Sequence, residues 1–160
     1  LFVPAFSPPH KQIDTPFQHR CQMVGLAISG NSHFQLSPIE QDLPLPSYAT
    51  NTLAYLEHMH PLAAFYFLIG EDSYYQLETW YQYRKLFRQA ELVVAQRSCT
   101  QQFRARRHFP ALSLPSKYYD FSSSEIRERC QLGRSIRYMM PESVQNYIEE
   151  QALYQNCETS

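Results

Sequence analysis

The stretch Ser122-Ser123-Ser124-Glu125-Ile126-Arg127 combines residue types that can hold a phosphate group. Three hydroxyl side chains begin a predicted helix there, and the helix start adds free backbone N–H groups and the positive end of the helix dipole. Arg127 follows one turn along and can add a charge-assisted hydrogen bond. The alternative is an ordinary N-cap followed by solvated arginines. Lys11 and an excess of positive charge in this part of the chain favour anion binding.

A second candidate stretch runs from Phe65 to Asp72, where five apolar or aromatic residues are followed by a glycine and two carboxylates. An uninterrupted apolar run is typical of a strand buried on both faces of a parallel sheet. Ligands of such sheets bind beyond the carboxyl ends of the strands. A crevice mouth is therefore expected at Gly70, Asp72, Tyr74, Tyr75, Trp80 and Tyr81. On these eight residues alone, an ordinary core strand with a polar turn remains the alternative.

The loop Pro8-Pro9-His10-Lys11 presents a histidine and a lysine at its tip. Prolines stiffen this loop. Thr15 as N-cap and Pro16 at the first helical position predict a helix after it, because proline suits the first turn. The apolar residues of this helix have helical spacing, and Gly30 ends the helix. These apolar residues are Phe17, Cys21, Val24 and Ile28.

The remaining elements alternate between strands and helices, which indicates βαβ units and a parallel sheet. Short strands are expected at His33–Leu36, Leu92–Ala95 and Leu112–Leu114. A helix from Tyr48 to His60 turns Leu53 and Leu56 inward and stops before Pro61; another, capped by Thr79, has Trp80, Tyr83 and Phe87 on one side. Ser122 and Glu125 have capping-box spacing before a helix that Gly133 closes. Pro141 starts a last helix that buries Val144 and Ile148.

Composition is that of one compact domain over residues 1–160, with 44% hydrophobic residues and a net charge of -1. That charge predicts neither a nucleic acid nor a membrane partner. Between Arg97 and Arg137, however, nine basic residues outnumber three acidic ones. The four cysteines are widely scattered, which favours reduced thiols in the cytoplasm. No apolar run approaches the ~20 residues of a membrane helix. The sequence leaves the oligomeric state open.

The sequence lacks the motifs of several common catalytic and nucleotide-binding mechanisms. Four glycines and the absence of G-x-G-x-x-G and G-x-x-x-x-G-K-[ST] disfavour Rossmann dehydrogenases and Walker ATPases. No serine or cysteine lies in a nucleophile motif, and no protein metal site is expected; His58 and His60 point to different sides of their helix. The remaining mechanism is catalysis by positioning of the substrates. Positive charge would hold phosphate groups, and aromatic side chains would stack on flat rings.

The sequence resembles bacterial nicotinate mononucleotide adenylyltransferases over its whole length, and the order of the shared motifs fits. The most specific matches are Ser122-Ser123 with Ile126-Arg127, and Gly70-x-Asp72 with Trp80-Tyr81. Further matches are Pro8-Pro9-His10-Lys11, Pro46-Ser47-Tyr48, Val93-Val94-Ala95-Gln96-Arg97 and Tyr138-Met139-Met140-Pro141.

The resemblance implies a Rossmann-like nucleotidyltransferase of the α/β class, with a parallel sheet and helices on both faces. It implies that ATP and nicotinate mononucleotide are joined into the deamido form of NAD, with release of pyrophosphate. Mg²⁺ would be bound with ATP, held mainly by phosphates and water.

The resemblance also implies residue roles. Trp80 would stack on the pyridine ring and the backbone at Tyr81 would receive its carboxylate, beside Tyr48 and Ala49. Residues implied for ATP are Gly70 and Asp72 at sugar and base, Arg97 near adenine, and His10, Lys11, Ser122, Ser123 and Arg127 at phosphates.

Two departures from the family pattern stand out. Ser47-Tyr48-Ala49 replaces the usual Ser-Tyr-Thr, which loses a hydroxyl that Thr50 is expected to replace in part. The motif Gly-Gly-x-Phe-Asp-Pro-x-His-x-Gly-His is not in this sequence, and Leu1-Phe2-Val3 looks like the end of a strand. A first βα unit, roughly 30 or more residues, is therefore expected upstream of Leu1, and with it the catalytic histidines.

Three hypotheses follow. The first is the bulk of the enzyme, the second a non-catalytic nucleotide-binding remnant or fragment, and the third a related nucleotidyltransferase with another acceptor, against which Trp80 argues. The codons immediately upstream of Leu1 separate the first two. For the 160 residues alone, no pyrophosphate release is expected with both substrates.

Overall fold

The computed structural model describes residues 1–96, 105–114 and 122–155. It divides into two compact units, which are considered separately. Unit 1 comprises Leu1–Asp42 with Asp120–Ser160, and unit 2 comprises Leu43–Tyr119. The expectation of a single nucleotidyltransferase domain over residues 1–160 stays a prediction.

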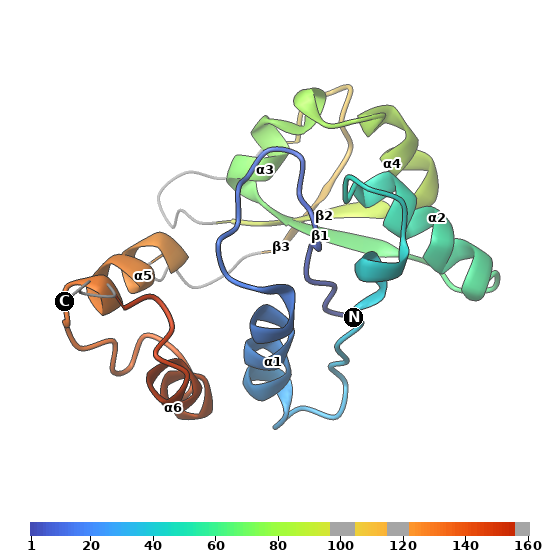
Figure 1. Cartoon of the computed structure of the whole chain (residues 1–160). Helices are drawn as coiled ribbons and strands as arrows, with labels where there is room; N and C mark the ends of the chain where they lie inside the picture. Colours follow the sequence, from blue (N-terminus) through green and yellow to red (C-terminus); the bar gives the residue numbers. More distant parts are fainter. Residues whose placement is uncertain (97–104, 115–121, 156–160) are drawn as a thin grey trace. The chain divides into compact units, whose positions relative to one another are not determined.

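Unit 2 is built on a parallel sheet, whose described strands follow the order β1-β2-β3 (Figure 1). The strands are β1 Tyr66–Gly70, β2 Glu91–Ala95 and β3 Leu112–Leu114. Leu68 pairs with Val93, and Val93 pairs with Leu112. The parallel pairing confirms the predicted α/β class and the strands expected at Leu92–Ala95 and Leu112–Leu114. The helical elements of unit 2 are α2 Ala49–Met59, α3 Glu71–Tyr75, the 3₁₀ turn η2 Leu77–Thr79 and α4 Tyr83–Gln89.

One face of the unit 2 sheet is packed, and the other carries exposed apolar side chains. Ile69, Leu92 and Val94 are buried in one cluster with side chains of α2 and α4. Successive side chains of a strand point to opposite faces, and Tyr66 and Leu68 on the other face are 62% and 57% exposed. The prediction that β1 is buried on both faces is therefore wrong, because an apolar run does not reveal whether its second face is covered.

Helix α2 confirms its prediction closely, whereas α4 corrects one. Leu53 and Leu56 of α2 are buried, as expected from their spacing. Thr79 was expected to cap α4, but it ends the turn η2 and its hydroxyl donates to the Gln76 carbonyl at 2.8 Å. Helix α4 begins only after Gln82, whose left-handed backbone (φ 49°) redirects the chain. Trp80 therefore precedes the helix.

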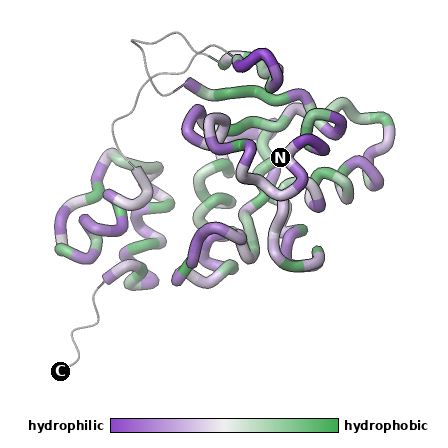
Figure 2. The backbone as a smooth tube through the Cα atoms, turned by 90° about the horizontal axis from the view of Figure 1, so that it is seen from above, coloured by the Kyte–Doolittle hydropathy of each residue, from purple (hydrophilic) through white to green (hydrophobic). Residues whose placement is uncertain are grey.

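Unit 1 contains amphipathic helices rather than a sheet in its described part. In Figure 2, hydrophobic and hydrophilic residues alternate along the helical tubes, as expected for helices packed on one side. None of the helices within the described ranges is long and apolar enough to cross a membrane. The helical elements are α1 Phe17–Ile28, the 3₁₀ turn η1 Ile39–Asp42, α5 Ser123–Gln131 and α6 Glu142–Glu150.

Helices α1 and α6 pack against each other within unit 1. The Nδ1 atom of His19 lies 2.7 Å from the hydroxyl of Tyr147. Val144 and Ile148 are buried, which confirms the prediction for the last helix. Pro16 occupies the N-cap of α1 without a side-chain cap, so the assignment of Thr15 to that position is wrong by one residue.

The N-terminal segment of unit 1 forms less β-structure than expected. The strand predicted at His33–Leu36 is reduced to one parallel bridge between Phe2 and Leu36. Backbone bonds flank the bridge, from the Phe2 N–H to the Gln35 carbonyl at 2.7 Å and from the Ser37 N–H to the Phe2 carbonyl at 2.8 Å. Phe2 and Phe34 also meet edge to face. These contacts fix the start of the loop that carries His10 and Lys11.

Candidate functional site

The carboxyl end of β1 places Gly70 and Asp72 beside each other, as the sequence predicts. Gly70 ends β1 and precedes α3, and Asp72 is exposed in the first turn of that helix. Gly70 has φ −74°, which any residue adopts, and a Cβ added there would meet no atom of the described structure within 4 Å. The fold itself does not require glycine at this position. Among the described residues, no atom blocks a close approach to the backbone at Gly70.

The start of α2 and the segment before α4 form an aromatic wall in unit 2. The rings of Tyr48 and Tyr81 stack with centroids 4.2 Å apart and planes inclined by 23°. Because the two rings are in direct contact, a pyridine ring cannot also lie between them. Ala49 follows Tyr48 as the first residue of α2. The structure thus brings together the predicted residues Tyr48, Ala49 and Tyr81.

Trp80 joins this wall from the sheet side. Its ring meets Phe67 of β1 edge to face, with centroids 6.3 Å apart and an interplanar angle of 70°. Trp80 is half-buried against the main cluster of unit 2. One part of the indole is therefore fixed by packing, and the rest is exposed.

Thr50 does not replace the missing hydroxyl beside Tyr48. It is 1% exposed, and its Oγ1 atom is buried without a hydrogen-bond partner in the described structure. The backbone carbonyl of Thr50 accepts a hydrogen bond from Gln89 Nε2 of α4 at 3.1 Å. The same Nε2 donates to Glu57 at 3.2 Å. Thr50 therefore helps to join α2 and α4, and the expected ligand contact is wrong.

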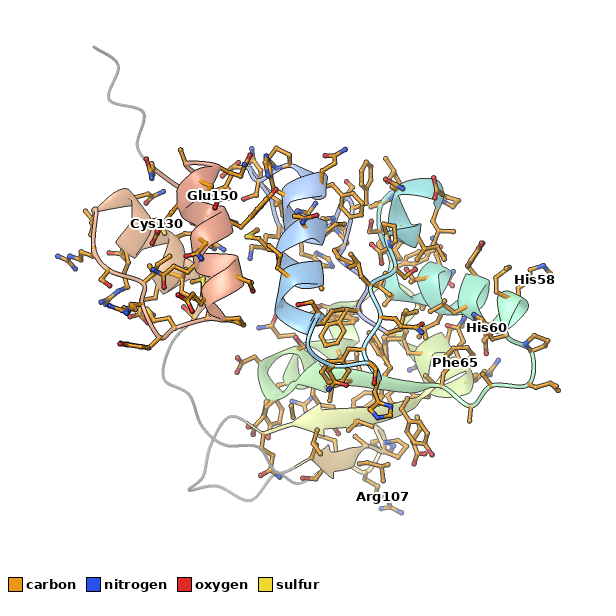
Figure 3. All side chains as sticks on the ribbon, turned by 90° about the horizontal axis from the view of Figure 1, so that it is seen from below. His58, His60, Phe65, Arg107, Cys130 and Glu150 are labelled. Atoms are coloured by element: carbon orange, nitrogen blue, oxygen red, sulfur yellow. The ribbon has the colours of Figure 1, made fainter. Side chains whose placement is uncertain are left out.

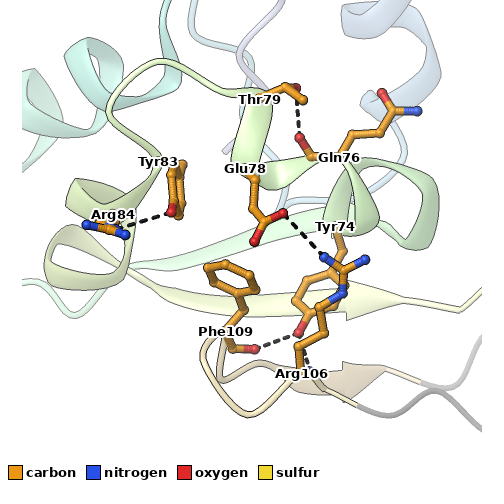
Figure 4. Close-up of polar contacts among 8 residues, drawn as sticks. All are labelled: Tyr74, Gln76, Glu78, Thr79, Tyr83, Arg84, Arg106 and Phe109. Atoms are coloured by element: carbon orange, nitrogen blue, oxygen red, sulfur yellow. Dashed lines mark hydrogen bonds and ion pairs between the residues drawn. The ribbon is translucent and has the colours of Figure 1, made fainter.

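Tyr74 is a structural residue that was wrongly expected at a crevice mouth. It is 1% exposed, and its hydroxyl donates to the Phe109 carbonyl at 2.6 Å (Figure 4). The same oxygen accepts the N–H of Arg106 at 2.7 Å. Arg106 in turn lies 3.8 Å from Glu78 and over the ring of Tyr75. Tyr74 thus fastens residues 105–109 to α3, a role that no sequence pattern revealed.

The N-terminus of α5 in unit 1 has the capped geometry predicted from its sequence. Ser122 is extended, and its Oγ accepts the N–H of Glu125 at 3.2 Å. Arg127 is half-buried and donates from Nη2 to Ser124 Oγ at 3.1 Å. Ser122 and Ser123 are exposed. Hydroxyls, helix N–H groups and a guanidinium therefore lie within one turn.

The remaining predicted residues lie on a loop or outside the described structure. His10 and Lys11 are exposed on the loop before α1. Arg97 falls outside the described residues, so its predicted role near adenine stays a prediction. The described residues hold no group of three or more His, Cys, Asp or Glu side chains that could bind a metal ion. His58 lies in the last turn of α2 and His60 is its C-cap (Figure 3).

Two cysteines, Cys21 and Cys130, lie in the described part of unit 1, and each is partly buried. Burial raises the pKa of the Cys21 thiol in α1, and the neighbouring Arg20 offsets this only in part. Burial also raises the pKa of the Cys130 thiol in α5. Because the thiolate is the reactive form, neither residue is suited to covalent catalysis.

Comparisons with known proteins identify the family. The cytidylyltransferase-like family matches residues 1–129. The probable nicotinate-nucleotide adenylyltransferase of Pelobacter propionicus is 37% identical over 98% of this chain and 84% of its own length, and that of Geobacter sulfurreducens is 38% identical over 96% and 83%. A Plasmodium falciparum nicotinic acid mononucleotide adenylyltransferase complexed with NaAD has the same fold, with a TM-score of 0.75, 22% identity and coverage of 95% of this chain and 80% of that one. The chain belongs to the nicotinate-nucleotide adenylyltransferases, within the cytidylyltransferase-like family.

Proposed function

We propose that this chain binds ATP and nicotinate mononucleotide for adenylyl transfer in NAD biosynthesis. In this reaction a phosphate oxygen of nicotinate mononucleotide forms a bond to the α-phosphorus of ATP, and the bond to pyrophosphate breaks. The observation that carries the proposal is family membership across nearly the whole chain. The protein's part in such a transfer is to position two anionic substrates and to stabilise their charge.

The aromatic wall of unit 2 is proposed to hold the pyridine end of nicotinate mononucleotide. Trp80 offers a flat apolar face that Phe67 holds in place. The backbone at Tyr81 would receive the carboxylate, while the stack on Tyr48 keeps that backbone beside the start of α2. Ala49, the first residue of α2, gives the wall no side-chain hydroxyl.

The N-terminus of α5 is proposed to hold ATP phosphates. Ser122 already satisfies one backbone N–H, so the N–H groups of Ser123 and Ser124 are the ones that face outward at the helix start. Arg127 supplies a permanent positive charge at the same turn. His10 and Lys11 are proposed to reach phosphate from their loop. Developing charge on the leaving pyrophosphate would be stabilised by these groups.

The end of β1 is proposed to meet the nucleotide sugar and base. Asp72 is exposed there and can accept hydrogen bonds from sugar hydroxyls. The open space at Gly70 allows a ligand to approach the main chain. Arg97 is proposed to lie near the adenine.

Mg²⁺ is proposed to enter with ATP. A Mg²⁺ ion usually keeps several waters and takes its other ligands from substrate phosphates. When bound, the ion would neutralise phosphate charge and favour departure of pyrophosphate. Arg127 and Lys11 would complement that charge from the protein side.

Binding measurements with two substitutions test the assignment. Trp80→Ala is expected to raise the Kd of nicotinate mononucleotide roughly 5- to 150-fold, because loss of ring stacking costs about 1–3 kcal/mol, and to leave the Kd of MgATP nearly unchanged. Arg127→Ala is expected to do the reverse, because a charge-assisted hydrogen bond contributes about 1.5–3 kcal/mol. Isothermal titration calorimetry with each ligand gives both constants.

Arg134→Ala is the matched control, since Arg134 is an exposed arginine just beyond the end of α5. This variant should bind both ligands as the parent protein does. Equal losses for both ligands in Trp80→Ala and in Arg127→Ala would contradict the roles assigned here.

A further inference from the structure

The loop between the Phe2 bridge and α1 carries two of the proposed phosphate-binding side chains at its tip. It contains Pro4, Pro8 and Pro9, and its turn at Pro9–His10 places His10 and Lys11 in solvent. Neither tip residue lies in a helix or strand. Something other than regular backbone hydrogen bonding must hold this loop in one shape if its tip is to meet a ligand reproducibly.

Arg20 on the first turns of α1 bonds to both limbs of this loop. Its Nη1 donates to the carbonyl of Ala5, and its Nη2 donates to the carbonyl of Phe6 at 3.3 Å. Its Nε donates to the carbonyl of Thr15 at 3.2 Å. One rigid guanidinium therefore ties the outgoing limb at residues 5–6 to the returning limb at residue 15.

The outgoing limb has a second tie, and Arg20 itself is held in place. The N–H of Phe6 donates to Glu40 Oε2 at 3.1 Å, and Glu40 is only 7% exposed. The rings of Phe6 and Phe17 meet edge to face at 5.0 Å. The Arg20 guanidinium lies 5.2 Å from the centroid of the Phe17 ring. The base of the loop is thus fixed by both polar and aromatic contacts.

We propose that Arg20 is a positioning residue that holds residues 5–15 as a closed loop and so presents Lys11 and His10 to the phosphates of ATP. This inference rests on the phosphate role given to the loop under Proposed function. The planar fork of arginine suits the task, because its donors have fixed directions and can reach both limbs at once. A lysine has a single ammonium and cannot hold the same three carbonyls in that geometry.

Proteolysis tests whether Arg20 closes the loop. The chain has three lysines, at positions 11, 85 and 117, so endoproteinase Lys-C can cleave the loop only after Lys11. Loosened loops are preferred cleavage sites. Arg20→Ala is expected to speed cleavage after Lys11 at least about tenfold, the factor that corresponds to losing one charge-assisted hydrogen bond. Cleavage after Lys85 in α4 should keep its parent rate, and Arg20→Lys should also show faster cleavage after Lys11.

Gln22→Ala is the control for this measurement, since Gln22 is an exposed residue of the same helix. It is expected to leave cleavage after Lys11 at the parent rate. Equal cleavage rates after Lys11 in Arg20→Ala and Gln22→Ala would overturn the proposal.

Ligand binding tests whether the closed loop serves Lys11. Arg20→Ala and Lys11→Ala are each expected to raise the Kd of MgATP roughly tenfold, and the double variant should be no weaker than the weaker single variant, because Arg20 acts through the loop tip. The Kd of nicotinate mononucleotide should stay at its parent value. If Lys11→Ala leaves the Kd of MgATP unchanged, the phosphate role fails and this inference with it. If that role holds but Arg20→Ala binds MgATP as Gln22→Ala does, or the two losses simply add, Arg20 is not a positioning residue.

Discussion

Each of the two units is stabilised internally by a different kind of contact. In the described part of unit 2, nine buried residues from two strands, four helical elements and the loop around Phe109 form one cluster. The corresponding cluster of unit 1 has three buried residues, Ile136, Val144 and Ile148. In unit 1 the candidate phosphate-binding segments depend instead on polar ties, such as those of Arg20 to the loop and of Ser122 to α5.

This difference indicates that the chain would position ligands in two ways, by packed aromatic rings in unit 2 and by directional hydrogen-bond donors in unit 1. A wall of aromatic rings needs packing behind it, because dispersion and area burial fix a ring only when many atoms touch it. A phosphate site needs donors of fixed direction, which caps and guanidinium forks provide with little buried area. Lost volume should therefore cost most in the packed core of unit 2, whereas the candidate phosphate-binding segments of unit 1 should respond mainly to lost hydrogen bonds.

Leu86→Ala should give the largest effect on stability. Leu86 of α4 is 0% exposed and lies in the main cluster of unit 2. Truncation leaves a cavity and is expected to lower the free energy of unfolding by about 2–5 kcal/mol. Urea denaturation followed by circular dichroism measures the change. Leu68→Ala, at a site 57% exposed on β1, is the control and should cost about 0.5 kcal/mol or less. Similar losses in both variants would contradict the packed-face assignment.

Tyr74→Phe should have the next largest effect, and it separates hydrogen bonding from volume inside unit 2. The change keeps the ring but removes the oxygen that serves both the Phe109 carbonyl and the Arg106 N–H. Leaving these groups unpaired is expected to cost about 1–3 kcal/mol of unfolding free energy in a denaturant titration. Tyr75→Phe, whose ring is 44% exposed, is the matched control with little expected change. A loss for Tyr74→Phe no larger than that of the control would show that packing alone holds residues 105–109.

Ser122→Ala tests the polar ties of unit 1 and should have a smaller effect. No described residue of α5 is buried, so its N-cap carries an unusual share of its stability. Loss of the cap is expected to cost about 1 kcal/mol, seen as a lower midpoint of thermal unfolding. Ser123→Ala, one residue further on and also exposed, should change the midpoint much less. If both serines matter equally, the capping geometry is not what stabilises α5.

Sequence patterns predicted the elements that follow hydrophobic spacing or capping rules. Leu53 and Leu56 of α2, and Val144 and Ile148 of α6, are buried because helical periodicity states which side faces a core. The Ser122 cap was also predicted, since a capping box is a local motif. The parallel sheet followed from the alternation of strands and helices.

What the sequence could not supply is which neighbour a side chain meets. Tyr74 and Tyr81 are the same residue type a few positions apart, yet one is buried and the other is 46% exposed. Thr50 turned inward, because in a helix the side that a threonine faces depends on what packs against that helix. The contacts of Arg20 are to backbone carbonyls, which every residue has, so no residue type signals them.

At Gly70, a substitution that stabilises the fold is expected to weaken nucleotide binding. Because its backbone angles suit any residue and a Cβ would meet nothing within the described structure, Gly70→Ala should stabilise the ligand-free protein by about 0.4–1 kcal/mol, through a less flexible unfolded chain. The same methyl group would project into the space proposed for a nucleotide. A selection for heat resistance would then favour this substitution, whereas a selection for nucleotide binding would reject it. In thermal unfolding, Gly70→Ala should be more stable than the parent protein without ATP and should gain less stability than the parent when ATP is added.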